Sequence, residues 1–397
     1  MTNEIKNVPE LRFKNESGKT YPDWEKRKLN EIADFQNGKA HESYVSETGN
    51  YILVNSKFIS TEAQVKKYVS QQLTPLNKQD IAIVMSDIPN GKALAKCFLV
   101  EESNKYSLNQ RIGRLYNILG DSRFVYAILN RNKQLLKYDS GVGQTNLKKS
   151  EIIEIIINWP VQDEQQKIGD FFSKLDRQIE LEEQKLAKLE EQKKGYMQKI
   201  FSQELRFKDE NGQEYPAWIN KKLGDIGKVS MNKRIYKNET SINGEIPFYK
   251  IGTFGKEAET FISREKFEEY KNKYPYPEKG DILISASGSI GRTIEYDGEE
   301  AYYQDSNIVW LDHNDEVLNI FLKYIYSVIK WSGIEGTTIK RLYNKDILNT
   351  KIDLPVIKEQ EKIGNFFGKI DDSIEKQSNK IELLKERKRG FLQKMFV

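Results

Sequence analysis

Two long stretches of the chain carry apolar residues at alternating steps of four and three positions. In the first stretch these residues are Ile168, Phe172, Leu175, Ile179, Leu186, Leu189, Tyr196 and Ile200. In the second stretch they are Ile363, Phe367, Ile370, Ile374, Ile381, Leu384, Phe391 and Met395. The spacing predicts two helices, each with a coiled-coil seam of more than about four heptads. A helix of about 40 residues forms a rod of roughly 60 Å.

We expect the two helices to pack on each other, because an apolar seam is not stable in water. The first helix has to lead the chain on to a second globular body of similar size, which favours an antiparallel arrangement. The two bodies would then lie at opposite ends of the rod and be related by a pseudo-two-fold axis. The alternative is that each helix lies on its own body, and the length of the seams counts against it.

Each helix follows a body in which the pattern changes to short apolar runs. Runs typical of strands are residues 51–59, 80–86, 281–287 and 307–311, and runs typical of helices are residues 123–138 and 316–331. The predicted fold class is α+β: two pseudo-repeated mixed α/β domains separated by two long helices that form an antiparallel coiled coil. The predicted segments are a first domain at 1–160, a central long helix at 161–203, a second domain at 204–355 and a distal long helix at 356–397.

The chain is an internal duplication. Residues 11–32 match residues 205–226, and residues 161–180 match residues 356–375. A long repeat period with this degree of identity indicates two copies of one unit. The segments between these matches share little beyond their pattern. Each copy therefore has a retained frame and a divergent body.

The first copy contains Gly18-Lys19-Thr20, the ending of a phosphate-binding loop. Such a loop needs a glycine five positions before the Gly-Lys pair, where this chain has Phe13, and a helix directly after it, where Tyr-Pro follows. The second copy keeps neither the lysine nor the threonine. We interpret the segment as a turn leading into a domain, with Trp24 and Trp218 anchoring equivalent places.

Composition and charge exclude several classes of site. The only cysteine is Cys97 and the only histidines are His41 and His313, so neither a disulfide framework nor a cysteine–histidine zinc site is expected. The net charge is only +4, so any basic patch has to come from the local arrangement of the 63 Lys and Arg residues. The first residues lack the apolar core of a signal peptide, and no apolar run is long enough for a membrane span. We expect a cytoplasmic protein without a membrane partner.

No catalytic set is evident, and no metal site is predicted. The Gly-x-Gly at 141–143 is short and absent from the second copy. A nuclease-like Glu-x-Lys at 183–185 falls on a predicted rod helix, where solvated charge is expected. No histidine has a neighbouring nucleophile to activate. We therefore expect a chain that is not catalytic by itself.

The bodies carry basic, amide and aromatic side chains in polar loops. Lys and Arg neutralise phosphates, Arg binds guanine edges with two hydrogen bonds, and Asn and Gln suit adenine. The DNA-binding candidates are Lys39, Asn109, Gln110, Arg111, Arg114, Thr145, Asn146, Lys148, Lys149, Lys233, Arg234, Tyr236, Lys237, Arg292, Gln304, Lys340 and Arg341.

The repeated helix starts, "DEQQKIGDFFSKLD" and "KEQEKIGNFFGKID", resemble those of specificity subunits of type I restriction–modification enzymes. The approach to each helix and "KGDILISASGSIG" at 279–291 are also similar to that family. In the first body the corresponding segment is "KQDIAIVMSDIPNG". The order body, helix, body, helix extends the resemblance over essentially the whole chain.

The resemblance implies a function and a set of partners. Each body would be a target recognition domain that reads one half of a split, asymmetric site in double-stranded DNA, and the rod would set the unread spacer. The chain itself would hold no cofactor. Its partners would be modification subunits, which methylate adenine with S-adenosylmethionine, and restriction subunits, which are translocases and nucleases that use ATP and Mg.

Two other classes remain open from the residues alone. One is an adaptor with two bodies that bind proteins, which the modest net charge slightly favours. The other is a self-contained nuclease or methyltransferase, which would be active as the purified chain. Duplex DNA binding that weakens steeply with salt separates the first class from a DNA-specificity subunit.

Overall fold

The computed structural model describes residues 9–88, 91–139, 141–333 and 341–396 and falls into two compact units. Unit 1 consists of Met1–Gln184 together with Asn379–Val397, and unit 2 consists of Lys185–Ser378. Each unit contains one mixed α/β body and a part of both long helices. The segment boundaries given above assign each long helix a segment of its own, and they remain a prediction.

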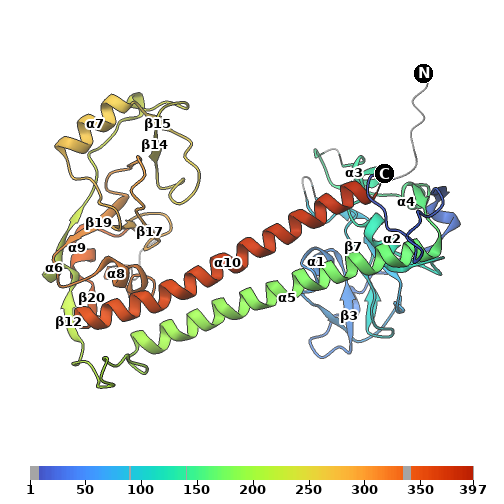
Figure 1. The fold of residues 1–397 in the computed structure, drawn as a ribbon, viewed down its shortest axis with the longest axis horizontal. Helices are drawn as coiled ribbons and strands as arrows, with labels where there is room; N and C mark the ends of the chain where they lie inside the picture. Colours follow the sequence, from blue (N-terminus) through green and yellow to red (C-terminus); the bar gives the residue numbers. More distant parts are fainter. Residues whose placement is uncertain (1–8, 89–90, 140, 334–340, 397) are drawn as a thin grey trace. The chain divides into compact units, whose positions relative to one another are not determined.

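The two long helices pack antiparallel in both units (Figure 1). Helix α5 spans Gln162–Phe201 and helix α10 spans Ile357–Met395. In unit 1, Phe171 at the start of α5 contacts Phe391 near the end of α10, with ring centroids 4.9 Å apart. In unit 2, Tyr196 near the end of α5 contacts Phe366 near the start of α10 at 5.1 Å. The predicted antiparallel coiled coil is confirmed.

Most positions of the two seams are buried or half-buried. Tyr196 is the exception, since it is 39% exposed and its neighbour Met197 takes the buried place. The residues with less than a tenth of their surface exposed are Ile168, Phe172, Ile179, Ile200, Ile363, Phe367, Ile381, Leu384 and Met395. Leu175, Leu186, Leu189, Ile370, Ile374 and Phe391 are half-buried.

Ion pairs occupy polar gaps in the seams. In unit 2, Lys193 Nζ lies 2.5 Å from Asp371 Oδ1, and in unit 1 Lys388 pairs with Asp176. The two pairs are equivalent, because each residue of one is 195 positions from its counterpart in the other. They fix the same register between α5 and α10 in both units.

The body of unit 1 is built on a four-stranded antiparallel sheet in the order β2-β9-β5-β7 and a three-stranded sheet in the order β4-β3-β8. Strands β3 and β8 are parallel to each other. The helices and strands are β1 (Glu25–Lys28), β2 (Asp34–Asn37), β3 (Tyr51–Val54), α1 (Ser56–Ser60), β4 (Tyr68–Val69), β5 (Ile81–Val84), β6 (Ser86–Asp87), β7 (Cys97–Leu99), β8 (Tyr106–Leu108), β9 (Ile112–Tyr116), α2 (Ser122–Leu129), α3 (Lys133–Leu136), β10 (Thr145–Asn146), α4 (Lys149–Ile153) and β11 (Ile156–Trp159). Two further pairs, β1 with β11 and β6 with β10, complete the body.

The body of unit 2 repeats this plan, with sheets β13-β19-β16-β17, β15-β14-β18 and β12-β20. Strands β14 and β18 are parallel, as β3 and β8 are. The helices and strands are β12 (Ile219–Lys222), α6 (Leu223–Ile226), β13 (Gly227–Ser230), β14 (Ile246–Tyr249), β15 (Phe261–Ile262), α7 (Arg264–Lys273), β16 (Ile282–Ser285), β17 (Thr293–Glu295), β18 (Tyr302–Tyr303), β19 (Ile308–His313), α8 (Asn319–Ile325), α9 (Asn344–Asn349) and β20 (Lys351–Leu354). Short 3-10 turns are η1 (Leu29–Glu31), η2 (Glu42–Tyr44) and η3 (Lys237–Glu239).

The sequence prediction is wrong in part of three runs. The run 51–59 is strand only as far as Val54, because Asn55 caps α1 by accepting a hydrogen bond from the Phe58 N–H at 2.9 Å. The run 123–138 is two helices, since Arg131 has a positive φ of 63° between them. The run 316–331 is helical only over α8.

The core of each unit joins the body to the long helices through equivalent aromatic contacts. In unit 1, Phe396 stacks on Phe172 at a centroid distance of 5.6 Å and contacts Phe124 in α2. In unit 2, Phe201 stacks on Phe367 at 6.2 Å and contacts Phe321 in α8. The body of each unit therefore has a fixed orientation on its own part of the rod.

Candidate nucleic-acid interface

The Gly-Lys-Thr segment forms a tight polar turn. The side-chain oxygen of Asn15 accepts hydrogen bonds from the N–H groups of Ser17 and Lys19. In the second copy Asp209 does the same for Asn211 and Gln213. The amides are satisfied within the turn, as expected for a structural element that is not a phosphate-binding loop.

A buried carboxylate closes this turn onto the start of each long helix. In unit 1, Glu164 is fully buried and accepts hydrogen bonds from Arg12 Nη2 at 2.6 Å and from Trp24 Nε1 at 3.0 Å. The hydrogen bonds to Glu164 are the main reason that the pKa of the Arg12 guanidinium is raised. In unit 2, Glu359 accepts the same bonds from Arg206 and Trp218, at 2.6 and 2.9 Å. Trp24 and Trp218 thus anchor equivalent places.

A buried glutamine links each long helix to its body. Gln165 donates to the Pro160 carbonyl at 2.8 Å and accepts from the Asp121 N–H at the start of α2. Gln360 donates to the Pro355 carbonyl at 2.8 Å and accepts from the Leu318 N–H at the start of α8. We call these glutamines, the two carboxylates and their partners the frame.

In both units the same backbone hydrogen bonds join three loops at one edge of the body. In unit 1, the Met85 N–H donates to the Arg111 carbonyl at 3.0 Å, and the Leu147 N–H donates to the Met85 carbonyl at 2.7 Å. We call this the loop ladder of unit 1; it joins residues 109–111, 85–87 and 145–147.

The loop ladder of unit 2 has the same backbone bonds and other side chains. The Ala286 N–H donates to the Asn307 carbonyl, and the Leu342 N–H donates to the Ala286 carbonyl, both at 2.8 Å. A bridge between Ser287 and Arg341 extends it. Segments far apart in the sequence are therefore brought together in the same way in both units.

The unit 1 ladder gathers the candidates Lys39, Asn109, Gln110, Arg111, Thr145 and Asn146. Lys39 is exposed and forms a parallel bridge with Asn109. Gln110 donates to Glu42 Oε1 at 2.7 Å, and Thr145 is buried against Asp139. Lys39, Gln110, Arg111 and Asn146 present exposed side chains.

The other candidates of unit 1, Arg114, Lys148 and Lys149, lie outside the loop ladder. Arg114 is 11% exposed, pairs with Asp80 Oδ2 at 2.6 Å and lies over the ring of Tyr116. Its guanidinium is thus engaged inside the body. Lys148 and Lys149 are exposed at the start of α4, directly after the ladder.

The unit 2 ladder gathers Gln304 and Arg341 and leaves other candidates apart. Gln304 is tied to the Ile251 N–H at 3.0 Å, and Arg341 donates to the Ser306 carbonyl at 3.1 Å. Arg234 pairs at 3.0 Å with Asp305, the residue that follows Gln304. Its neighbour Lys233 lies over the Tyr274 ring.

The remaining candidates of unit 2 lie away from its ladder or outside the described residues. Tyr236 and Lys237 are exposed on the adjoining 3-10 turn. Arg292 precedes β17 and donates to the Gly255 carbonyl at 3.4 Å. Lys340 lies outside the described residues. The DNA contacts of all these residues remain a prediction.

The candidate set omitted three residues that the structure places beside the unit 1 ladder. Asn55, Ser56 and Lys57, at the end of β3, line a hollow of about 320 Å³ together with residues 109–111. The parallel pairing of β3 and β8 brings the carboxyl ends of both strands to one edge. The sequence signal for this was weak, because residues 51–59 read as one uninterrupted strand.

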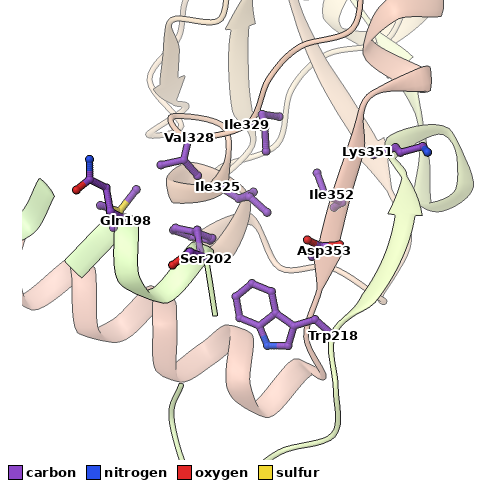
Figure 2. Close-up of a pocket in the computed structure, with 11 residues that line it drawn as sticks. Gln198, Ser202, Trp218, Ile325, Val328, Ile329, Lys351, Ile352 and Asp353 are labelled. Carbon is purple, nitrogen blue, oxygen red and sulfur yellow. The ribbon is translucent and has the colours of Figure 1, made fainter. Parts of the chain in front are cut away.

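A larger hollow of about 610 Å³ in unit 2 lies between the end of α5, α8 and β20 (Figure 2). It is lined by Met197, Gln198, Phe201, Ser202, Trp218, Ile325, Val328, Ile329, Lys351, Ile352 and Asp353. Figure 2 shows Val328 and Ile329 on one side of it and the Trp218 indole on the opposite side. The lining is mainly apolar and lies apart from the loop ladder, so we assign no DNA contact to it.

A search of the described residues for membrane-crossing helices finds none that is both long and apolar enough. Even α5 and α10, the two longest helices, are rich in charged residues.

Comparison with known proteins gives consistent matches over this repeated architecture. The family described as type I restriction modification DNA specificity domain matches residues 21–191 and again residues 216–385. A Haemophilus influenzae protein described as a type I restriction enzyme specificity subunit is 58% identical over 151 residues, which are 38% of this chain and 39% of that relative. The MjaVIII specificity subunit of Methanocaldococcus jannaschii is 25% identical over 96% of this chain and 94% of its own.

Solved structures match the fold of the chain. The S subunit of the type I restriction–modification system from M. genitalium has a TM-score of 0.62 at 20% identity and covers 98% of this chain and 99% of its own. The family matches cover both copies of the duplication and each includes one body with its loop ladder. The chain therefore belongs to the type I restriction–modification DNA specificity family.

Proposed function

We propose that each unit reads one half of a bipartite, asymmetric site in double-stranded DNA. The observation that carries this proposal is the repeated loop ladder. Its backbone bonds are the same in both units, yet the side chains differ, with the exposed Asn146 in one unit where the half-buried Arg341 stands in the other. Two copies of one scaffold with different side chains at the same edge suit the reading of two different half-sites.

The chemistry of the ladder residues suits DNA. Exposed lysines such as Lys39 and Lys148 neutralise phosphates and position the duplex. Arginine and amide side chains such as Arg111 and Gln110 complement base edges in the major groove. Sequence specificity would then come from the ladders, and affinity from the surrounding cations.

We propose that the paired helices set the unread spacer and that the repeated frame docks two identical modification subunits. The repeated frame, held by Glu164 in one unit and Glu359 in the other, gives both units equivalent elements, as two copies of one partner require. Half-sites about one helical turn apart, roughly 34 Å, present both major grooves on one face of the DNA.

We assign the chemical steps to partner subunits. Modification subunits would bring S-adenosylmethionine for adenine methylation, and restriction subunits would bring ATP and Mg for translocation and cleavage. The chain would direct both activities to its site and be non-catalytic by itself.

Adenine methylation across the host genome, compared with and without the gene for this chain, tests the proposal. We expect a split motif that is methylated only when the chain is present. A genome that loses no split motif on deletion of the gene would contradict the proposal.

A further inference from the structure

The turn that ends β8 in unit 1 holds an arginine in an unfavourable backbone conformation. Residues 109–111 join β8 to β9, and Arg111 has a φ of 65°. This left-handed region favours glycine, because a Cβ meets the backbone there. The turn conformation fixes the direction in which the Arg111 side chain leaves the backbone.

The guanidinium of Arg111 is free. Across the described residues it makes no hydrogen bond, ion pair or ring contact, and the residue is exposed. Every other described arginine between residues 9 and 184 has a partner. These are Arg12 with Glu164, Arg27 with Glu25, Arg114 with Asp80, Arg123 with Asp121, Arg131 with the Leu94 carbonyl and Arg177 with Glu180.

A second polar group beside Arg111 also lacks a partner. Oδ1 of Asn109 is buried and accepts no hydrogen bond from any described residue. Both residues line the hollow of about 320 Å³ at the carboxyl ends of β3 and β8. Of the two groups only the exposed Arg111 guanidinium can reach a ligand, and its forked donors suit a ligand that offers two acceptors.

We infer that Arg111 reads a guanine in the major groove of the half-site bound by unit 1, an inference that rests on the function proposed above. Guanine presents two acceptors, O6 and N7, which match the two N–H groups of a guanidinium fork. The Arg111 carbonyl accepts a hydrogen bond from the Met85 N–H, which fixes the backbone of the turn.

In unit 2 the position of Arg111 in the ladder is taken by Asn307, whose carbonyl accepts from the Ala286 N–H. The left-handed residue of that turn is its neighbour Ser306, with a φ of 52°. The arginine near this turn, Arg341, comes from the other loop and is bound to the Ser306 carbonyl. Arg111 is therefore a feature of unit 1 alone, and its loss should affect one half-site only.

The test uses the full chain expressed with the modification subunit of its own host. Arg111→Gly removes the side chain and suits the positive φ, so the fold should be at least as stable as before. Arg111→Lys keeps the charge and loses the fork. Arg131→Gly is the matched control, because Arg131 is also exposed, lies in unit 1 and has a φ of 63°.

We expect both Arg111 variants to methylate a motif in which one guanine of one half-site becomes degenerate, with the other half-site unchanged. On duplexes that differ only at that guanine, the wild type should discriminate by about 5- to 150-fold, and the variants should not. Arg131→Gly should keep the motif.

Three results would overturn the inference while leaving the proposed function intact. One is an unchanged motif in Arg111→Gly. Another is full recovery in Arg111→Lys, and the third is a uniform loss of affinity on all sequences, since both indicate a phosphate contact. A wild-type complex that methylates no split motif would instead contradict the proposed function.

Discussion

The buried carboxylates of the frame give the most direct prediction about stability. Glu164 accepts three hydrogen bonds, two from Arg12 and one from Trp24, and none of its surface is exposed. In Glu164→Gln an amide NH₂ has to face at least one of these donors. The change leaves the Arg12 charge, which is 10% exposed, without its counter-charge.

Removing one partner of a buried ion pair destabilises a protein by about 3–5 kcal/mol. For a unit of this size that is a loss of roughly 6–20 °C in Tm. The equivalent change Glu359→Gln should cost about as much, because its three bonds are the same. Glu180→Gln is the control, since its partner Arg177 is exposed and such pairs contribute at most about 1 kcal/mol.

Thermal and urea unfolding of the full chain, followed by circular dichroism, measure these differences. We expect Glu164→Gln and Glu359→Gln to unfold well before Glu180→Gln. If all three variants unfold together within about 1 kcal/mol, the carboxylates do not hold the frame in the way described.

Three further predictions concern the rod, a candidate residue and the cysteine. Deleting one heptad from each long helix removes roughly 10 Å of rod. The methylated motif should then have a spacer shorter by about three base pairs. Altered half-sites would show that the rod does not set the spacer. Arg114→Ala should destabilise unit 1 by about 3–5 kcal/mol by leaving Asp80 unpaired, with the methylation motif kept; a changed motif at full stability would place Arg114 in recognition. Burial raises the pKa of the Cys97 thiol, which keeps it protonated at pH 8, so thiol reagents should label it only after unfolding; rapid labelling of the folded chain would contradict its burial.

Much of the fold was predictable because periodicity and repetition act over long stretches. The four-three spacing gave both long helices, and the repeat gave the equivalence of Trp24 and Trp218. Short elements were not predictable in this way. Asn55 ends the predicted strand at 51–59 because it caps the helix that follows. Arg131, with its positive φ, divides the predicted helix at 123–138. Neither feature changes the pattern of apolar positions.

The candidate interface was less predictable, because residue type says little about what a side chain already contacts. Arg111 and Arg114 look alike in sequence, yet one is free and the other is bound to Asp80. The loop ladder depends on backbone bonds between Met85, Arg111 and Leu147, which no local pattern records.

The central claim is that each unit reads its own half-site. Replacing residues 33–147 with residues 227–342 tests it most directly. The junctions are the equivalent buried pairs Ile32 with Ile226 and Leu147 with Leu342. Glu164, Gln165, Arg12 and Trp24 are kept, and the N–H of Leu318 takes the place of the Asp121 N–H opposite Gln165. The resulting chain carries the second body twice.

The measurement is the adenine-methylation motif produced by this chimaera together with the host's modification subunit. We expect a palindromic motif, in which the half-site of unit 2 occurs twice in inverted orientation with the wild-type spacer. A motif that stays asymmetric, or that still contains the half-site of unit 1, would contradict it.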